Sequence, residues 1–91
     1  PLQLHLEQKR KPPLLVVKGL PKKVSRKSCE VSGHTELGVR VFINSKEILT
    51  TAEGEFRHAV ALERGINIIV VEAVDAVGNV SYRSSTVHGK F

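Results

Sequence analysis

The stretch from Gly65 to Tyr82, GINIIVVEAVDAVGNVSY, constrains the fold more than any other part of the chain. Its first half alternates between two faces and is rich in β-branched residues, with Ile66, Ile68 and Val70 on one face and Ile69, Val71 and Ala73 on the other. That pattern is typical of a strand. After Asp75, Gly78 and Asn79 supply turn chemistry, because glycine adopts positive φ and Asx side chains bond nearby backbone. The stretch therefore predicts a β-hairpin.

The rest of the chain predicts further short strands packed around this hairpin. Turn signals separate segments of period-two alternation, and no segment shows the spacing of an amphipathic helix. Asn44 and Ser45 are predicted to form one of the tight turns. We expect strands over residues 14–18, 24–33, 39–43, 47–49, 56–62 and 66–74, with a last strand from residue 80. About seven short strands at this spacing indicate an all-β fold, a single antiparallel β-sandwich.

The inward faces of these strands define the expected core. The single cysteine excludes an internal disulfide framework, and Cys29 is predicted to be a small buried hydrophobe. His58 shares its face with core residues and is predicted to be partly buried. The expected inter-sheet core consists of Cys29, Val31, Val39, Val41, Phe56, Val60, Leu62, Ile69, Val71 and Ala73.

The first residues differ in composition from the rest. Leu2, Leu4 and Leu6 alternate with polar residues, and a charged run ending at Pro12-Pro13 then breaks the pattern. Consecutive prolines favour a stiff extended connector. We expect residues 1–11 to be a basic linker or the end of a preceding domain, and residues 12–91 to be the sandwich. The chain lacks an initiator Met and a signal-peptide pattern, so we expect it to be a piece of a longer protein.

The net charge of +5 is concentrated near the N-terminus. Residues 1–27 contain eight Lys or Arg residues and one Glu, a balance of +7, whereas residues 28–91 have a balance of −2. Such a cluster attracts nucleic acid, anionic lipid or an acidic polymer, or it is a solvated linker with a lysine-protected strand edge. No aromatic residue precedes Phe42, which argues against a specific nucleic-acid site of the base-stacking kind.

Candidate catalytic, metal and cofactor sites find no support in the sequence. The four histidines are scattered without the short spacings of a zinc site, and no glycine-rich phosphate loop is present. Ser81, Ser84 and Ser85 lack a nucleophile elbow. No stretch approaches the roughly 18 apolar residues of a transmembrane segment. We predict no enzyme activity, no metal and no cofactor.

An ordered set of motifs resembles a known family. The motifs are Gly33-His34-Thr35, Gly38-Val39-Arg40-Val41-Phe42-Ile43-Asn44, Gly54-Glu55-Phe56, Leu62 with Gly65 and Asn67, and Asp75 with Gly78-Asn79. They are similar to those of bacterial immunoglobulin-like domains. They also resemble the accessory β-sandwich domain of glucodextranase and related secreted glycosidases. The resemblance runs from about residue 12 to residue 87 and implies an immunoglobulin-like sandwich. Ser45 and Glu53 depart from the usual glycine and aspartate of the motifs.

The resemblance implies a noncatalytic structural or adhesive module of a bacterial surface or secreted multidomain protein. The alternative is a carbohydrate-binding or accessory domain of a secreted glycoside hydrolase. Either implies a location outside the cell or in the cell envelope. The expected partners are flanking domains of the same chain or another protein, with a glycan as a further possibility. Few aromatic rings are expected to be exposed for stacking on sugars, which argues against glycan binding.

Two groups of residues are candidates for specific roles. If Ile69, Val71 and Ala73 face the core, the opposite side of the same strands is apolar where an antiparallel sheet usually presents polar residues to water. We predict an interaction surface there, formed by Arg40, Phe42, Ile66, Ile68, Val70 and Val74. Asn67, Asp75, Gly78 and Asn79 are predicted to hold turns by hydrogen bonds to backbone, and not to bind metal.

Overall fold

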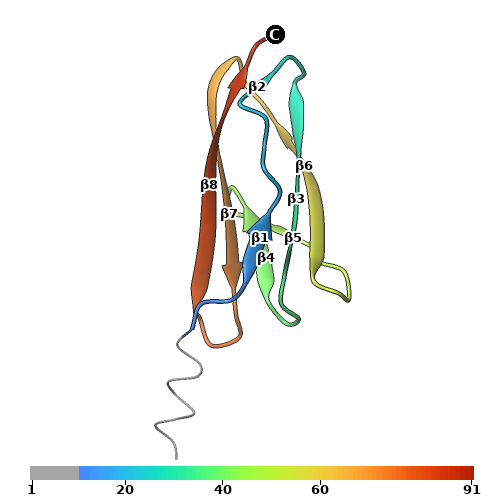
Figure 1. Ribbon diagram of the computed structural model, residues 1–91, viewed down its shortest axis with the longest axis vertical. Coiled ribbons are helices and arrows are strands. Elements are labelled where there is room, and N and C mark those ends of the chain that lie inside the picture. Colours follow the sequence, from blue (N-terminus) through green and yellow to red (C-terminus); the bar gives the residue numbers. More distant parts are fainter. Residues whose placement is uncertain (1–10) are drawn as a thin grey trace, which may run out of the picture.

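Eight strands form two sheets that pack face to face in a computed structural model, which describes residues 11–91 (Figure 1). The three-stranded sheet has the order β1-β3-β6, with β1 at Leu15–Val17, β3 at Ser28–Thr35 and β6 at Glu55–Ala61. The five-stranded sheet has the order β2-β8-β7-β4-β5, with β2 at Lys23–Val24, β8 at Val80–Gly89, β7 at Gly65–Val74, β4 at Arg40–Ile43 and β5 at Lys46–Ile48. The predicted all-β immunoglobulin-like sandwich is confirmed.

One expected strand is in fact two. Residues 24–33 were predicted to form a single strand, but the chain bends at residues 25–27 and passes from one sheet to the other. Leu62 donates a backbone hydrogen bond of 2.8 Å to the Lys27 carbonyl, which fixes the bend against the three-stranded sheet. The short β2 pairs parallel with the end of β8, in the register Lys23↔His88 and Val24↔Gly89. The sandwich therefore contains eight strands and is not wholly antiparallel.

The predicted hairpin is the longest pairing in the molecule. β7 and β8 run antiparallel from Gly65↔Gly89 to Val74↔Val80. Ten residues of continuous ladder satisfy the backbone groups of the long apolar strand. The hairpin prediction is confirmed.

A tight turn joins β4 to β5, as predicted from Asn44 and Ser45. Both residues have positive φ, 48° and 70°, which is the backbone of a two-residue hairpin turn matched to strand twist. The Asn44 side chain also accepts a 2.8 Å hydrogen bond from the Val70 N–H, and the Asn44 N–H donates to the Val70 carbonyl at 2.9 Å. The turn is thereby tied to β7.

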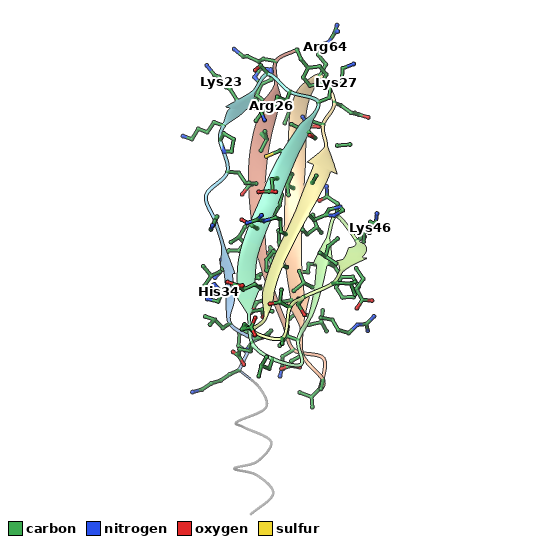
Figure 2. The ribbon with its side chains drawn as sticks, turned by 90° about the vertical axis from the view of Figure 1, so that its right-hand side faces the viewer. Lys23, Arg26, Lys27, His34, Lys46 and Arg64 are labelled. Carbon is green, nitrogen blue, oxygen red and sulfur yellow. The ribbon has the colours of Figure 1, made fainter. Side chains whose placement is uncertain are left out.

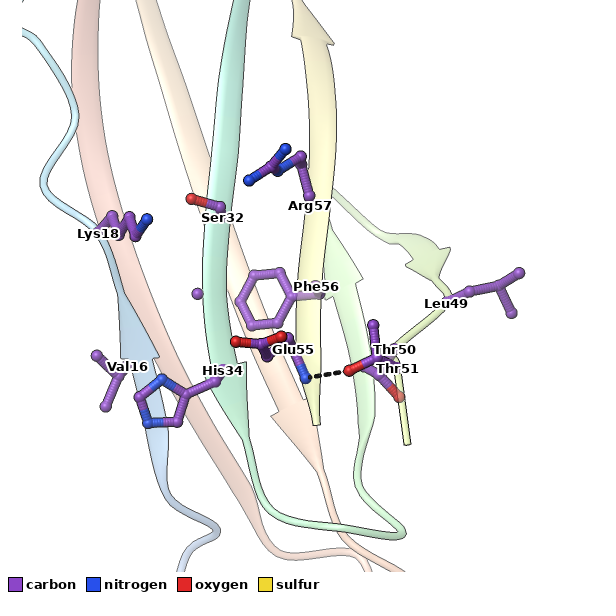
Figure 3. Close-up of a pocket in the computed structure, with 11 residues that line it drawn as sticks. Val16, Lys18, Ser32, His34, Leu49, Thr50, Thr51, Glu55, Phe56 and Arg57 are labelled. Carbon is purple, nitrogen blue, oxygen red and sulfur yellow. Dashed lines mark hydrogen bonds between the residues drawn. The ribbon is translucent and has the colours of Figure 1, made fainter. Parts of the chain in front are cut away.

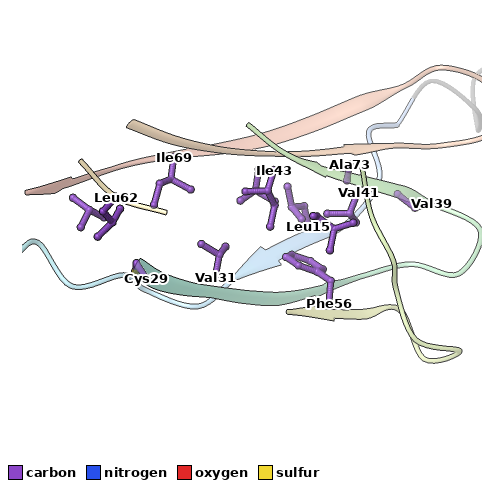
Figure 4. Packing of buried hydrophobic residues seen from close by; sticks show 13 residues of the cluster. Leu15, Cys29, Val31, Val39, Val41, Ile43, Phe56, Leu62, Ile69 and Ala73 are labelled. Atoms are coloured by element: carbon purple, nitrogen blue, oxygen red, sulfur yellow. The ribbon is translucent and has the colours of Figure 1, made fainter. Parts of the chain in front are cut away.

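The core fills the space between the two sheets (Figure 4). Nine of the ten expected core residues are buried, and the tenth, Val60, is half-buried and packs against the others. Cys29 is buried as predicted, and burial raises the pKa of its thiol. His58 is half-buried, also as predicted. The prediction missed four buried residues: Leu15, Ile43, Ile48 and Val87.

The N-terminal side of the sandwich is fixed by Thr35, the one buried polar side chain among residues 11–91. Its hydroxyl donates a 2.6 Å hydrogen bond to the Leu14 carbonyl, so its burial costs little. β3 therefore continues to Thr35, two residues beyond the turn start expected at Gly33. The strand expected from Leu2, Leu4 and Leu6 lies outside the described residues.

Candidate interaction surfaces

The side of the five-stranded sheet that faces away from the core exposes seven apolar side chains, which alternate across the strands with Glu72, Ser84, Thr86 and His88. We call it the outer face and define it by Phe42, Ile66, Ile68, Val70, Val74, Val80 and Tyr82. The exposed fraction is 65% for Ile66, 62% for Ile68 and 64% for Tyr82. Phe42, Val70 and Val74 are half-buried by their neighbours on the same face. The outer face includes five of the six residues predicted to form an interaction surface, and sequence analysis missed Val80 and Tyr82.

The strand registers bring these side chains together across three strands. Val74 of β7 lies between Arg40 of β4 and Val80 of β8. In the next row on the same face, two residues away along β7, Glu72 lies between Phe42 and Tyr82. Cross-strand neighbours on one face are about 4.5–5.5 Å apart at Cβ, so each row is continuous. The signal that would have added Val80 and Tyr82 is the hairpin register, which sequence alone did not fix.

Arg40, the sixth predicted surface residue, forms a polar border to the outer face. Its guanidinium donates two hydrogen bonds to the Glu47 carboxylate, at 3.0 and 2.8 Å, and lies 5.2 Å from the centre of the Phe42 ring. The hydrogen bond from Arg40 lowers the pKa of Glu47, and the same bond raises the pKa of Arg40. A cation stacked on an aromatic ring and held by a bidentate carboxylate has few alternative positions. Arg40 and Phe42 thus form an ordered edge.

The predicted turn residues Asp75, Gly78 and Asn79 meet in the loop between β7 and β8. The Asp75 carboxylate accepts hydrogen bonds from the Val77 N–H at 3.0 Å, the Asn79 N–H at 2.8 Å and the Asn79 side-chain amide at 2.9 Å. Gly78 has a φ of 90°, which other residues adopt only with strain. The Asn79 side chain is the main cause of the lowered pKa of Asp75.

Asn67, the fourth predicted turn residue, lies at the other end of β7. Its side-chain oxygen accepts a 2.8 Å hydrogen bond from the Glu63 N–H. Its amide nitrogen lies within hydrogen-bond distance of three carbonyls, those of Glu63 at 2.9 Å and of Gly65 and Val87 at 3.2 Å. The side chain therefore joins the β6–β7 turn to the end of β8.

A groove of about 610 Å³ crosses the outside of the three-stranded sheet and the loop before β6 (Figure 3). Val16, His34 and Glu55 lie side by side in the strand register, with Leu49 and Thr51 at the loop. Phe56 lines the groove but is only 4% exposed, so its ring offers no open face for stacking on a sugar. This groove was not predicted from the sequence, because its lining comes from four separate segments.

Within residues 11–91, no three His, Cys, Asp or Glu side chains gather in a way that would hold a metal ion. The same part of the chain contains no helix with the length and hydropathy to cross a membrane.

The chain is similar to domains of carbohydrate-active enzymes. The family model described as glucodextranase, domain B, matches residues 19–91. The crystal structure of an FMN-binding beta-glucuronidase from Facaelibacterium prausnitzii L2-6 is similar, with a TM-score of 0.57 and 25% sequence identity. The match covers 88% of this chain but only 12% of that chain. No curated protein matches significantly. Because the family match extends over most of its residues, the chain belongs to the glucodextranase domain B family.

Proposed function

We propose that this chain is a noncatalytic accessory domain of a longer glycoside hydrolase, and that its outer face packs against a neighbouring domain of that protein. The exposed apolar outer face is the observation that carries the proposal. Membership of the glucodextranase domain B family supports the accessory role. The similar beta-glucuronidase is about eight times longer than the segment that this chain matches, which is the expected relation between an accessory domain and a whole enzyme. The same relationships favour a bacterial protein that acts outside the cell.

The composition of the outer face suits a contact between domains. Isolated apolar side chains on a surface are common, whereas a contiguous patch above a few hundred square ångströms usually marks a contact. Tyr82 and Phe42 supply aromatic anchors, and Ile66 and Ile68 extend the patch along β7. Glu72, Glu47 and Arg40 lie among and beside these residues and supply polar groups. An apolar centre with aromatic and arginine residues and a polar rim is the usual anatomy of an interface.

The carboxylates of this face support a noncatalytic role. Glycoside hydrolysis requires two carboxyl groups on either side of the scissile bond, one of them protonated as an acid. Glu47 and Glu72 flank Phe42 across the sheet. Both oxygens of Glu47 accept hydrogen bonds from Arg40, which also lowers the pKa of Glu47, so this carboxylate is already engaged in a surface ion pair. The pair is better suited to the rim of an interface.

Thiol labelling tests whether the outer face is covered in the longer protein. Cys29 is buried and burial raises the pKa of its thiol, so the native background of labelling is low. In an Ile68→Cys variant, the new thiol should react with maleimide rapidly in the 91-residue chain and at least about tenfold more slowly in the full-length protein. The matched control is Leu49→Cys, because Leu49 is 90% exposed and lies outside the outer face. Its labelling rate should be similar in both proteins.

Equal labelling of position 68 in both proteins would contradict the packing of this face on a neighbouring domain. Sedimentation of the 91-residue chain at several concentrations distinguishes the accessory role from the adhesive role that the resemblance also implies. A dimer that forms at increasing concentration and is lost in a Phe42→Ser, Ile68→Thr double variant would favour an adhesive contact between copies. A chain that stays monomeric while position 68 is protected in the full-length protein supports the accessory role.

A further inference from the structure

Six cationic side chains from separate segments gather at one end of the sandwich. We call this end the basic tip and define it by Lys22, Lys23, Arg26, Lys27, Arg64 and Lys90. Figure 2 shows Lys23, Arg26, Lys27 and Arg64 together at the end of the sandwich far from His34. The three segments 21–28, 62–65 and 88–91 contain these six cations and a single carboxylate, Glu63, which gives a balance of +5.

Backbone hydrogen bonds hold the segments of the basic tip together. Leu62 donates to the Lys27 carbonyl at 2.8 Å, which places Arg64 near the bend that bears Arg26 and Lys27. His88 donates to the Lys22 carbonyl at 2.8 Å, and Lys90 donates to the Val24 carbonyl at 2.7 Å. The cations are therefore concentrated by the fold, and their backbone cannot separate without breaking these bonds.

The charge of the basic tip is not neutralised within the domain. Among the described residues, the ion pairs are Arg40 with Glu47 and Arg57 with Glu30, and neither involves a cation of the tip. The remaining residues from 12 to 91 contain five cations and seven carboxylates, a balance of −2. A cluster of one sign opposite a slightly acidic body attracts and orients a polyanion over about a Debye length, roughly 8–10 Å in physiological salt.

The other side chains of the tip favour a hydrated polyanion. Lys23 and Arg26 line a shallow groove of about 370 Å³ with the hydroxyl groups of Ser25 and Ser28, which suit the hydroxyls of a sugar. Glu30 also lines this groove, and its carboxylate lies 3.7 Å from the Arg57 guanidinium. The segments of the basic tip expose no aromatic ring that would stack on a nucleobase, and the one large exposed aliphatic side chain beside them is Ile66, whose partner His88 also pairs with Lys23. Phe91 is half-buried and packs against the core.

We infer that the basic tip binds an anionic polysaccharide, a chain whose carboxylate or sulfate groups contact its lysines and arginines. The basic tip adjoins the outer face at Ile66, whose partner His88 also pairs with Lys23, but binding at the tip does not require the neighbouring domain. It would give the domain affinity for an acidic glycan while the outer face stays free for packing.

Binding of defined polymers to the 91-residue chain tests this inference. The probes are polygalacturonate, which carries carboxylates, heparin, which carries sulfates, and neutral dextran. The tip variant is Arg26→Ser, Lys27→Ser, Arg64→Ser, and the matched control is Lys18→Ser, Lys46→Ser, Arg83→Ser. All six residues are exposed, and both variants lose three positive charges.

Relative to the unsubstituted chain, the affinity of the tip variant for at least one of the two acidic polymers should fall by more than about tenfold. The affinity of the control variant should fall by less than about twofold. The logarithm of the affinity should fall linearly with that of salt concentration. By analogy with nucleic acids, where each neutralised charge adds about 0.7–0.9 to this slope, the tip variant should show a slope smaller by about 2. Comparing the two polymers distinguishes carboxylate from sulfate recognition.

Three results would overturn the inference. Equal losses in the two variants would show that net charge alone governs binding. Equal affinity for dextran would show that the anionic groups are irrelevant. Tighter binding of an oligothymidylate or of phosphatidylserine vesicles than of both acidic polymers would assign the tip to nucleic acid or to a membrane instead.

Discussion

Asp75 and Asn79 hold each other across the loop between β7 and β8 through three hydrogen bonds. The Asp75 carboxylate accepts from the Asn79 N–H at 2.8 Å and from its side-chain amide at 2.9 Å, and the Asp75 N–H donates to the Asn79 carbonyl at 3.0 Å. The first and the last residue of the loop are thus locked together. This closes the turn at the point where β8 begins its pairing with β7.

The Asp75 carboxylate should make stability depend on pH in the acidic range. Its pKa in the folded protein is lowered from 3.8, chiefly by the hydrogen bond from the Asn79 side chain. A group whose pKa is lower in the folded state stabilises the fold above its unfolded pKa, and that contribution is lost as the pH falls through the folded pKa. In Asp75→Asn, we therefore expect a melting temperature below that of the wild type at pH 7. The difference should disappear as the pH falls below 3.8.

Thermal melts of both proteins between pH 7 and pH 2 measure this effect. Glu53→Gln is a suitable control, because Glu53 is an exposed carboxylate in a different loop. It should show no comparable loss at pH 7. A constant difference between wild type and Asp75→Asn over the whole pH range would contradict a role for the Asp75 charge.

Gly33 should tolerate no larger side chain, because three chain segments meet at its Cα. A Cβ built there would collide with the Val16 carbonyl oxygen and would lie 2.9 Å from the Phe56 ring. Gly33→Ala must displace β1 or Phe56, and overpacking of this kind typically costs about 1–3 kcal/mol. Gly19→Ala is the matched control, since no atom lies within 4 Å of a Cβ at that position. Urea unfolding of the two variants should show a large loss of stability for Gly33→Ala only, and equal losses would contradict the close contact.

Replacing Asn67 with alanine or with aspartate should lower the stability of the fold. Alanine removes the acceptor of the Glu63 N–H, which is exposed, and the donor near the part-buried carbonyls of Gly65 and Val87. A hydrogen bond of this kind contributes about 0.5–1.5 kcal/mol to stability. Aspartate keeps the acceptor for the Glu63 N–H, but its second oxygen faces the carbonyl oxygens that the amide nitrogen contacts. We expect Asn67→Asp to unfold at a urea concentration no higher than Asn67→Ala. An aspartate variant as stable as the wild type would show that only the acceptor matters.

The sequence was sufficient to predict elements whose pattern is local. The alternation of Ile68, outside, and Ile69, inside, identified β7 and both of its faces, because neighbouring residues of a strand point to opposite sides. The Asn44-Ser45 turn was predicted for the same reason, since its backbone depends on those two residues. Leu15 was missed as a core residue because it lies in the run Leu14 to Val17, where four apolar residues in succession conceal the period of the strand.

Features that depend on contacts between distant segments were not predictable in this way. β2 is only two residues long and exists because Lys23 and Val24 meet the end of β8, about 65 residues further along the chain. The excess of cations in residues 1–27 was visible in the sequence, but the concentration of the four at residues 22–27 with Arg64 and Lys90 depends on the hydrogen bonds from Leu62 and Lys90. Tyr82 joined the outer face only once the β7–β8 register placed it beside Glu72.

The loop between β7 and β8 should not bind calcium. One oxygen of Asp75 already accepts hydrogen bonds from the N–H groups of Val77 and Asn79, and the other accepts one from the Asn79 amide. Calcium needs six to eight oxygen ligands, and binding here would break the bonds that close the turn. A ligand that binds only the folded state raises its melting temperature. We therefore expect the melting temperature of chelator-treated protein to be the same with and without millimolar calcium, and the same holds for Asp75→Asn. A rise of several degrees in the wild type that is absent in Asp75→Asn would identify a calcium site at this turn.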